Sequence, residues 1–119
     1  MTKAQYLSKI FTSEDQFQAA THRFINVNYA ELRHFYFHVP NESATSDQMR
    51  MKLCAMGVLP GVPDIIFLKP YVWCMELKMI KGIVSDRQKA LHELWRSIGI
   101  KTYVCRSQIE VINVLQEVL

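Results

Sequence analysis

Cysteines are few in this chain, and their spacing excludes two kinds of small protein. There are three, Cys54, Cys74 and Cys105, and no two of them form a CxxC pair. An odd number of widely spaced cysteines indicates neither a disulfide framework nor a zinc site. We therefore expect a reducing, intracellular setting.

Long apolar runs are absent as well. Residues 1–6 lack the apolar segment of a signal peptide, and no run of about 18 apolar residues could cross a bilayer. The chain also has no glycine-rich phosphate loop and no Ser/His/Asp arrangement. We expect no membrane partner and no enzyme of the classes that use those motifs.

The composition indicates one globular domain over residues 1–119. Half of the residues are hydrophobic and 21% are charged. The length allows one core and is too short for two. The net charge of +3 permits a polyanionic partner, but an excess this mild is common in proteins that never bind nucleic acid.

The most informative segment runs from Gly61 to Lys78. Two apolar runs rich in β-branched and aromatic residues flank a short connection that contains Pro70, which is the pattern of an antiparallel hairpin. A turn centred on Pro70 sets the register and brings two carboxylates side by side. The opposed pairs are Phe67 with Trp73, Ile65 with Met75, and Asp64 with Glu76.

Two opposed acids need something to offset their repulsion. Opposed side chains on a ladder have Cβ atoms about 4.5–5.5 Å apart, where like charges destabilise the sheet. A divalent cation with oxygen ligands, such as Mg²⁺, is the natural partner. Lys78 follows Glu76 by two residues and shares its face of the strand. Asp64, Glu76 and Lys78 around a metal ion would form a hydrolytic centre for phosphodiesters.

The rest of the chain alternates between helices and strands around this hairpin. Capping patterns begin at Ser13, Ser46, Ser85 and Ser107, and residues 1–12 carry no period, so we expect them to form a short arm. The predicted helices span residues 14–29, 46–56, 85–98 and 107–119, and the other predicted strands span 34–39 and 101–105. This order predicts an α/β sandwich with a sheet flanked by helices.

Three predictions concern packing. The stripe Leu91, Leu94, Trp95 and Ile98 is expected to bury one face of helix 85–98. Helix 107–119 is apolar over most of its circumference, so it is either enclosed by the domain or shared with a second copy. His34 and His38 lie about 13 Å apart on a strand, too far to share one ion, and are expected at the solvent or the core edge.

Four short motifs together resemble a known group of enzymes. Pro63-Asp64, followed after eleven residues by Glu76-Leu77-Lys78, is similar to the PD-(D/E)xK nuclease superfamily. With Pro40-Asn41-Glu42, Gly61-Val62-Pro63-Asp64 and Ser85-Asp86-Arg87-Gln88 in the same order, the chain resembles more narrowly the virus-type replication-repair nuclease (VRR-NUC) family. The resemblance covers about Ser13 to Arg106. It implies a restriction-endonuclease-like core with a mixed β-sheet flanked by helices.

The resemblance also implies a metal-dependent nuclease with Mg²⁺ or Mn²⁺ as cofactor. Asp64, Glu76 and the main-chain carbonyl of Leu77 would bind the metal. Lys78 would orient or help to deprotonate the attacking water. Glu14 opens a helix, where it either favours the helix dipole or completes the metal site. Gln88 faces the active site in the family, although a capping box alone explains it.

Four further residues are candidates for substrate binding. Glu42 and Ser85 fall in the family's motifs, while turn and capping chemistry are their structural alternatives. Arg50 and Lys52 would contact phosphates or would be ordinary solvated charges. Of these four, the resemblance implies that Glu42 lies near the active site.

These features predict a structure-specific endonuclease that acts on branched DNA such as four-way junctions. Family resemblance and the apolar last helix favour a homodimer in the cytoplasm of a bacterial or virus-infected cell, or on the nucleoid. The main alternative is a non-catalytic nucleic-acid-binding or assembly subunit that retains the fold. A nuclease-fold enzyme with a different substrate is a third possibility.

Overall fold

A computed structural model describes residues 1–40 and 46–119 and contains a four-stranded mixed sheet. The strands are β1 (Tyr36–His38), β2 (Ile65–Phe67), β3 (Trp73–Leu77) and β4 (Lys101–Cys105), in that order across the sheet. β1, β2 and β3 pair antiparallel, whereas β3 and β4 run parallel. The predicted α/β class with a mixed sheet is therefore confirmed.

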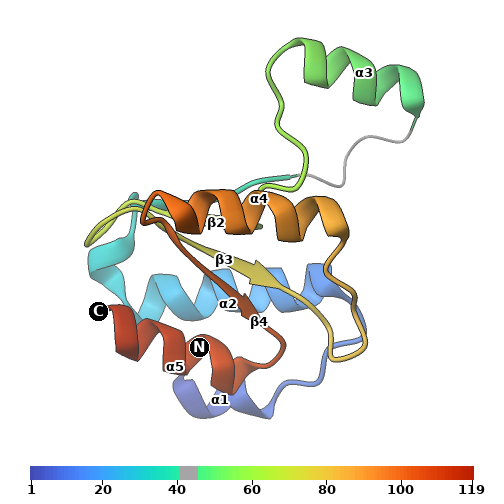
Figure 1. The fold of residues 1–119 in the computed structure, drawn as a ribbon. Helices are drawn as coiled ribbons and strands as arrows, with labels where there is room; N and C mark the ends of the chain where they lie inside the picture. The colour runs from blue at the N-terminus through green and yellow to red at the C-terminus, as the bar shows by residue number, and fades with distance from the viewer. Residues whose placement is uncertain (41–45) are drawn as a thin grey trace.

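Helices cover both faces of this sheet. One layer contains α1 (Lys3–Ser8), α2 (Glu14–Asn28) and α5 (Gln108–Val118), while α4 (Asp86–Ser97) lies on the opposite face (Figure 1). A single 3-10 turn, η1 (Ala30–Leu32), links α2 to β1. The short α3 (Asp47–Ala55) projects away from the body of the domain and buries none of its residues (Figure 1).

The predicted hairpin register is confirmed. Ile65 pairs with Met75 and Phe67 with Trp73. The rings of Phe67 and Trp73 stack with centroids 3.8 Å apart, and the Trp73 indole donates a hydrogen bond to the Lys69 carbonyl at 3.0 Å. Buried aromatic pairs of this kind stabilise a sheet beyond the area they bury. The hairpin is thus locked at its turn, far from its acidic end.

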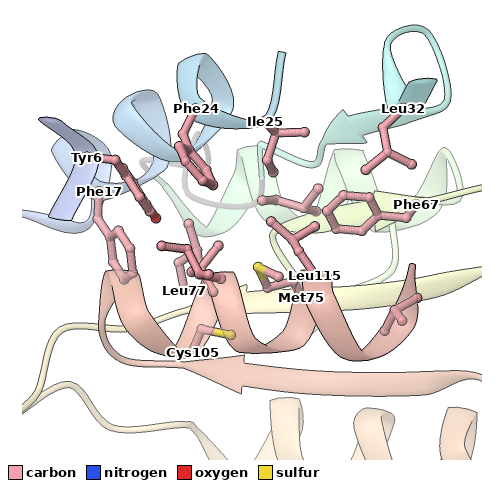
Figure 2. Packing of buried hydrophobic residues seen from close by; sticks show 14 of the residues in the cluster. Tyr6, Phe17, Phe24, Ile25, Leu32, Phe67, Met75, Leu77, Cys105 and Leu115 are labelled. Atoms are coloured by element: carbon pink, nitrogen blue, oxygen red, sulfur yellow. The ribbon is translucent and has the colours of Figure 1, made fainter. Parts of the chain in front are cut away.

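The core fills the space between the sheet and the layer formed by α1, α2 and α5. Side chains such as Phe24, Met75, Leu77 and Leu115 meet there (Figure 2). The apolar residues of α5 are mostly enclosed by the domain itself, with Val111, Ile112, Leu115 and Val118 buried. The last helix therefore leaves little apolar surface for a second copy. This removes the argument that linked its composition to a dimer.

The prediction of an aperiodic N-terminal arm is wrong. Residues 3–8 form α1, which begins with a capping box between Thr2 and Gln5. Tyr6 is fully buried, stacks on Phe24, and shares a hydrogen bond of 2.7 Å with the Thr21 hydroxyl. A helix this short is marginal alone, so tertiary burial of Tyr6 holds it.

The predicted buried stripe of α4 is also wrong. Leu94 and Ile98 are 63% and 73% exposed, while His92, expected on the polar face, is the one fully buried residue of the helix. Toward the sheet α4 presents a polar row at intervals of four residues. Gln88 donates to Glu76, His92 lies beside Glu76, and Arg96 donates to the Thr102 carbonyl at 2.6 Å. The buried carboxyl group of Glu76 on the sheet therefore determines that the polar face of α4 packs against the sheet.

Candidate active site

The acidic end of the hairpin opens into a cleft of about 230 Å³. Its walls come from the start of α2, the ends of β1 and β3, the residue before β2, and the first turn of α4. The lining side chains are Glu14, Asp15, Gln18, His38, Asp64, Glu76, Lys78 and Gln88. Five of the predicted site residues therefore meet at one place, although they lie far apart in the sequence.

Asp64 and Glu76 lie on neighbouring strands at the floor of the cleft. Asp64 directly precedes β2, and its Oδ2 accepts a hydrogen bond of 2.8 Å from the Leu77 amide. Glu76 is only 2% exposed. One of its oxygens, Oε1, accepts a bond of 3.3 Å from the Gln88 amide, whereas Oε2 is buried and makes no hydrogen bond with the described residues.

This environment raises the pKa of Glu76 to about 9. Burial is the largest cause, followed by the charge of Asp64 and a hydrogen bond with it, while Lys78 acts in the opposite direction. In the metal-free protein the Glu76 carboxyl therefore keeps its proton at neutral pH. A divalent cation in the cleft would reverse this, because it favours the ionised form.

Lys78 and Glu14 form the opposite side of the cleft. The Lys78 ammonium lies 3.9 Å from Oε1 of Glu14, and its side chain is largely buried. Arg106 holds the turn that follows Lys78, donating to the carbonyls of Met79 at 3.0 Å and Gly82 at 2.6 Å. The turn therefore keeps the lysine directed along the wall of the cleft. Sequence analysis gave Arg106 no role.

A metal ion fits this donor set if main-chain oxygens and waters complete the coordination that Asp64 and Glu76 begin. Within residues 1–40 and 46–119, no three His, Cys, Asp or Glu side chains lie close enough to hold a metal by themselves. Two opposed carboxylates supply hard oxygen ligands, which suits Mg²⁺ because it usually retains several waters. The unbonded, buried Oε2 of Glu76 offers lone pairs that a cation would satisfy.

Gln88 makes both of the contacts expected of it, one in the capping box of α4 and one in the cleft. Its side-chain oxygen accepts from the Ser85 amide at 2.9 Å, completing the capping box of α4. Its side-chain nitrogen donates to Glu76. The loop before Asp64 also lies close to this turn, since a Cβ on Gly61, with φ of +87°, would be 3.1 Å from the Arg87 carbonyl oxygen. Only glycine fits comfortably there.

Three of the four predicted substrate contacts, Ser85, Arg50 and Lys52, do not line the cleft. Ser85 caps α4 and lines a neighbouring hollow of about 310 Å³ together with Arg50 and Arg87. Arg50 is paired with Asp47 at 3.3 Å on the projecting α3. Lys52 is exposed on the same helix and does not line the cleft. Glu42 lies outside the described residues.

Several cleft residues were missed by sequence analysis. His38 lines the cleft, and its Nδ1 donates to the Asp64 carbonyl at 3.0 Å, so it lies nearer the site than expected. Asp15 and Gln18 follow Glu14 on α2. His92 lies one helical turn after Gln88, on the same face of α4. If Gln88 faces Glu76, this spacing predicts that His92 also lies beside Glu76.

Comparison with known proteins supports the fold. No family model matches the chain, and no curated protein matches it. Among solved structures, a VRR_NUC domain protein matches with a TM-score of 0.71 and 21% identity, over 93% of this chain and 91% of that one. The chain therefore has the fold of a VRR-NUC domain, as its motifs implied. No helix of the described residues is long and apolar enough to span a membrane.

The raised pKa of Glu76 makes the stability of the metal-free protein depend on pH. An acid with a higher pKa in the folded state than its ordinary value of 4.5 stabilises the fold at low pH. That contribution is lost as pH rises toward about 9. In EDTA, we expect urea denaturation to show falling wild-type stability between pH 5 and pH 9, and a flatter profile for Glu76→Gln.

Glu93→Gln provides the matched control, because Glu93 is exposed on α4. It should follow the wild-type profile. Parallel profiles for wild type and Glu76→Gln would show that Glu76 does not titrate abnormally.

Proposed function

We propose that this protein is a divalent-metal-dependent nuclease of the VRR-NUC family that hydrolyses phosphodiester bonds in DNA. The observation that carries the proposal is the meeting of Asp64, Glu76 and Lys78 in one cleft of a VRR-NUC fold. A binding module has no need of two opposed acids beside a lysine, because their repulsion destabilises the sheet.

In this proposal each residue of the cleft has a separate role in metal binding or catalysis. Asp64, Glu76 and the Leu77 carbonyl would hold Mg²⁺ or Mn²⁺. Glu14, the third acid predicted for the metal, lines the same cleft, although the described acids do not form a three-carboxylate site. The bound cation supplies a water of lowered pKa and neutralises charge at the scissile phosphate. Lys78 orients that water and stabilises the developing negative charge. Gln88 holds the Glu76 carboxyl from α4.

A cleavage assay tests this function directly. Duplex, single-stranded, flap and four-way junction DNA, with RNA for comparison, would be incubated with the protein and Mg²⁺, Mn²⁺ or EDTA. We expect metal-dependent cleavage that Asp64→Ala abolishes, because one of the two paired carboxylate ligands is lost. Glu117→Ala removes an exposed acid on α5 and should leave cleavage unchanged.

Full activity of Asp64→Ala across a metal titration would end this proposal. Binding of DNA without cleavage under any metal condition would instead support the non-catalytic subunit.

Lys78 should act in chemistry more than in binding. Its ammonium lies inside the cleft, so Lys78→Ala should slow single-turnover cleavage by about 10²-fold or more while DNA affinity changes little. Lys81→Ala removes an exposed lysine three residues later and controls for the loss of one positive charge. Much weaker binding with a normal single-turnover rate would contradict this role.

We further propose that the protein acts as a homodimer on branched DNA. One domain offers a single metal centre, whereas resolving a four-way junction needs two incisions, which a two-fold pair of centres would supply. The surface for this contact lies on α3, α4 and the segment between α3 and β2. Its exposed apolar residues are Met49, Met51, Met56, Val58, Leu59, Leu94 and Ile98.

Two observations favour a second copy as the partner of this surface. α3 buries none of its residues and makes no extensive contact with another helix or strand of the described chain. A shallow groove of about 350 Å³, lined by residues that include Leu59, Leu91 and Leu94, lies beside α4. Exposed methionines on α3 and an apolar groove on the same chain can satisfy each other across a two-fold axis, because an isologous interface uses the same patch twice.

Charges placed on α4 should therefore break the dimer. Light scattering at tens of micromolar protein is expected to give a dimer mass for wild type and a monomer mass for the double variant Leu94→Glu, Ile98→Glu. Ile10→Glu, at a position that is also exposed but lies between α1 and α2, should remain dimeric. A wild-type monomer would remove the dimer, and equal cleavage of linear duplex and junction would separately remove the junction preference.

A further inference from the structure

We infer that His92 is a positioning residue for Glu76: its buried imidazole donates the hydrogen bond that fixes the Glu76 carboxylate when a divalent cation is bound. This inference rests on the proposed metal site and adds a residue that neither the motifs nor the fold comparison assign.

Burial and distance define the pair. His92 is 1% exposed, and its Nε2 lies 4.0 Å from Oε2 of Glu76. Both atoms are buried, and neither makes a hydrogen bond with any described residue. A distance of 4.0 Å is too long for a hydrogen bond, but a shift of about 1 Å would form one.

Leaving two polar atoms unpaired in an apolar interior costs free energy. Two such atoms that face each other are therefore best explained as partners that meet in another state of the site. Cation binding supplies that state, because a carboxylate oxygen that ligates a cation keeps a lone pair for an N–H donor.

The position of His92 on α4 supports this role. Gln88, His92 and Arg96 follow one another at intervals of four residues and all face the sheet. Gln88 donates to Oε1 of Glu76, and Arg96 fixes the helix by donating twice to the Thr102 carbonyl. One helical face thus presents one donor to each oxygen of the same carboxylate.

A leucine would fill this space more cheaply, because it brings no polar atom into the interior. The histidine at this position is explained by its control of the orientation of the Glu76 carboxylate. Hydrogen-bonding partners of metal ligands typically change metal affinity by about 10- to 100-fold when they are removed.

Mn²⁺ binding to the full chain without DNA tests the inference, measured by calorimetry and by electron paramagnetic resonance. His92→Leu and His92→Met keep an apolar side chain of similar size without a donor. Both should weaken the affinity for Mn²⁺ by about 10- to 100-fold. His92→Gln restores an N–H at a similar reach and should bind Mn²⁺ within about threefold of wild type, since the outer contact is kept.

Asp64→Asn identifies the signal that belongs to the cleft, and thermal unfolding verifies that each variant is folded. Wild-type affinity in the folded leucine or methionine variant would overturn the role of His92 while leaving the proposed function intact. Weak binding by His92→Gln equal to that of His92→Leu would also overturn it, because packing alone would then matter. Failure of wild type to bind Mn²⁺ through Asp64 would remove the metal site and this inference together.

Discussion

The opposition of Asp64 and Glu76 across the hairpin is the constraint on which the rest of the site depends. Stacking of Phe67 on Trp73 near the turn fixes the register, so the two acids meet at the other end whatever their repulsion. The core beneath β2 and β3 holds Met75 and Leu77, while α4 covers Glu76 on the other face of the sheet. Apolar packing thus supplies the free energy that holds the two carboxyl groups together, although the negative charge of Asp64 raises the pKa of Glu76.

The same buried acid determines how α4 lies on the sheet. Glu76 points toward this helix, so the helix presents Gln88 and His92 to it and turns Leu94 and Ile98 outward. This orientation of α4 accounts for two proposed properties of the protein. One is an ordered carboxylate ligand, and the other is an apolar outer face for a second copy. A change that removed the acid would weaken the reason for both.

Much of the fold could be predicted because several signals agreed. The hairpin register follows from alternation and one turn, and the motif order points to the VRR-NUC fold that the structural comparison supports. The periodicity of α4 gave a wrong prediction. Its apolar stripe indicated a buried face, but contact with Glu76 turns the polar stripe toward the sheet. α1 was missed because six residues carry no usable period, and its stability comes from burying Tyr6.

The site could be predicted only where a motif names its residues. Asp64, Glu76 and Lys78 meet in the cleft as their spacing suggested, and Gln88 and Glu14, whose place the resemblance implied, also line it. His38 and His92 carry no motif, and their place depends on which strand end and which helical face meet the acids. Arg50 and Lys52 lie on α3, which buries none of its residues, so no apolar pattern within the sequence could locate them relative to the cleft.

In the proposed metal site, a proton and a cation would compete for the carboxyl of Glu76. With the pKa of Glu76 raised to about 9, the metal-free protein holds a proton where a metal would bind. Metal binding must release that proton, so affinity should strengthen as pH rises toward this value and level off above it. Lys78 favours the ionised form from one side, and Asp64 opposes it from the other. In the proposed metal site, the acid pair would therefore become fully ionised only together with a bound cation.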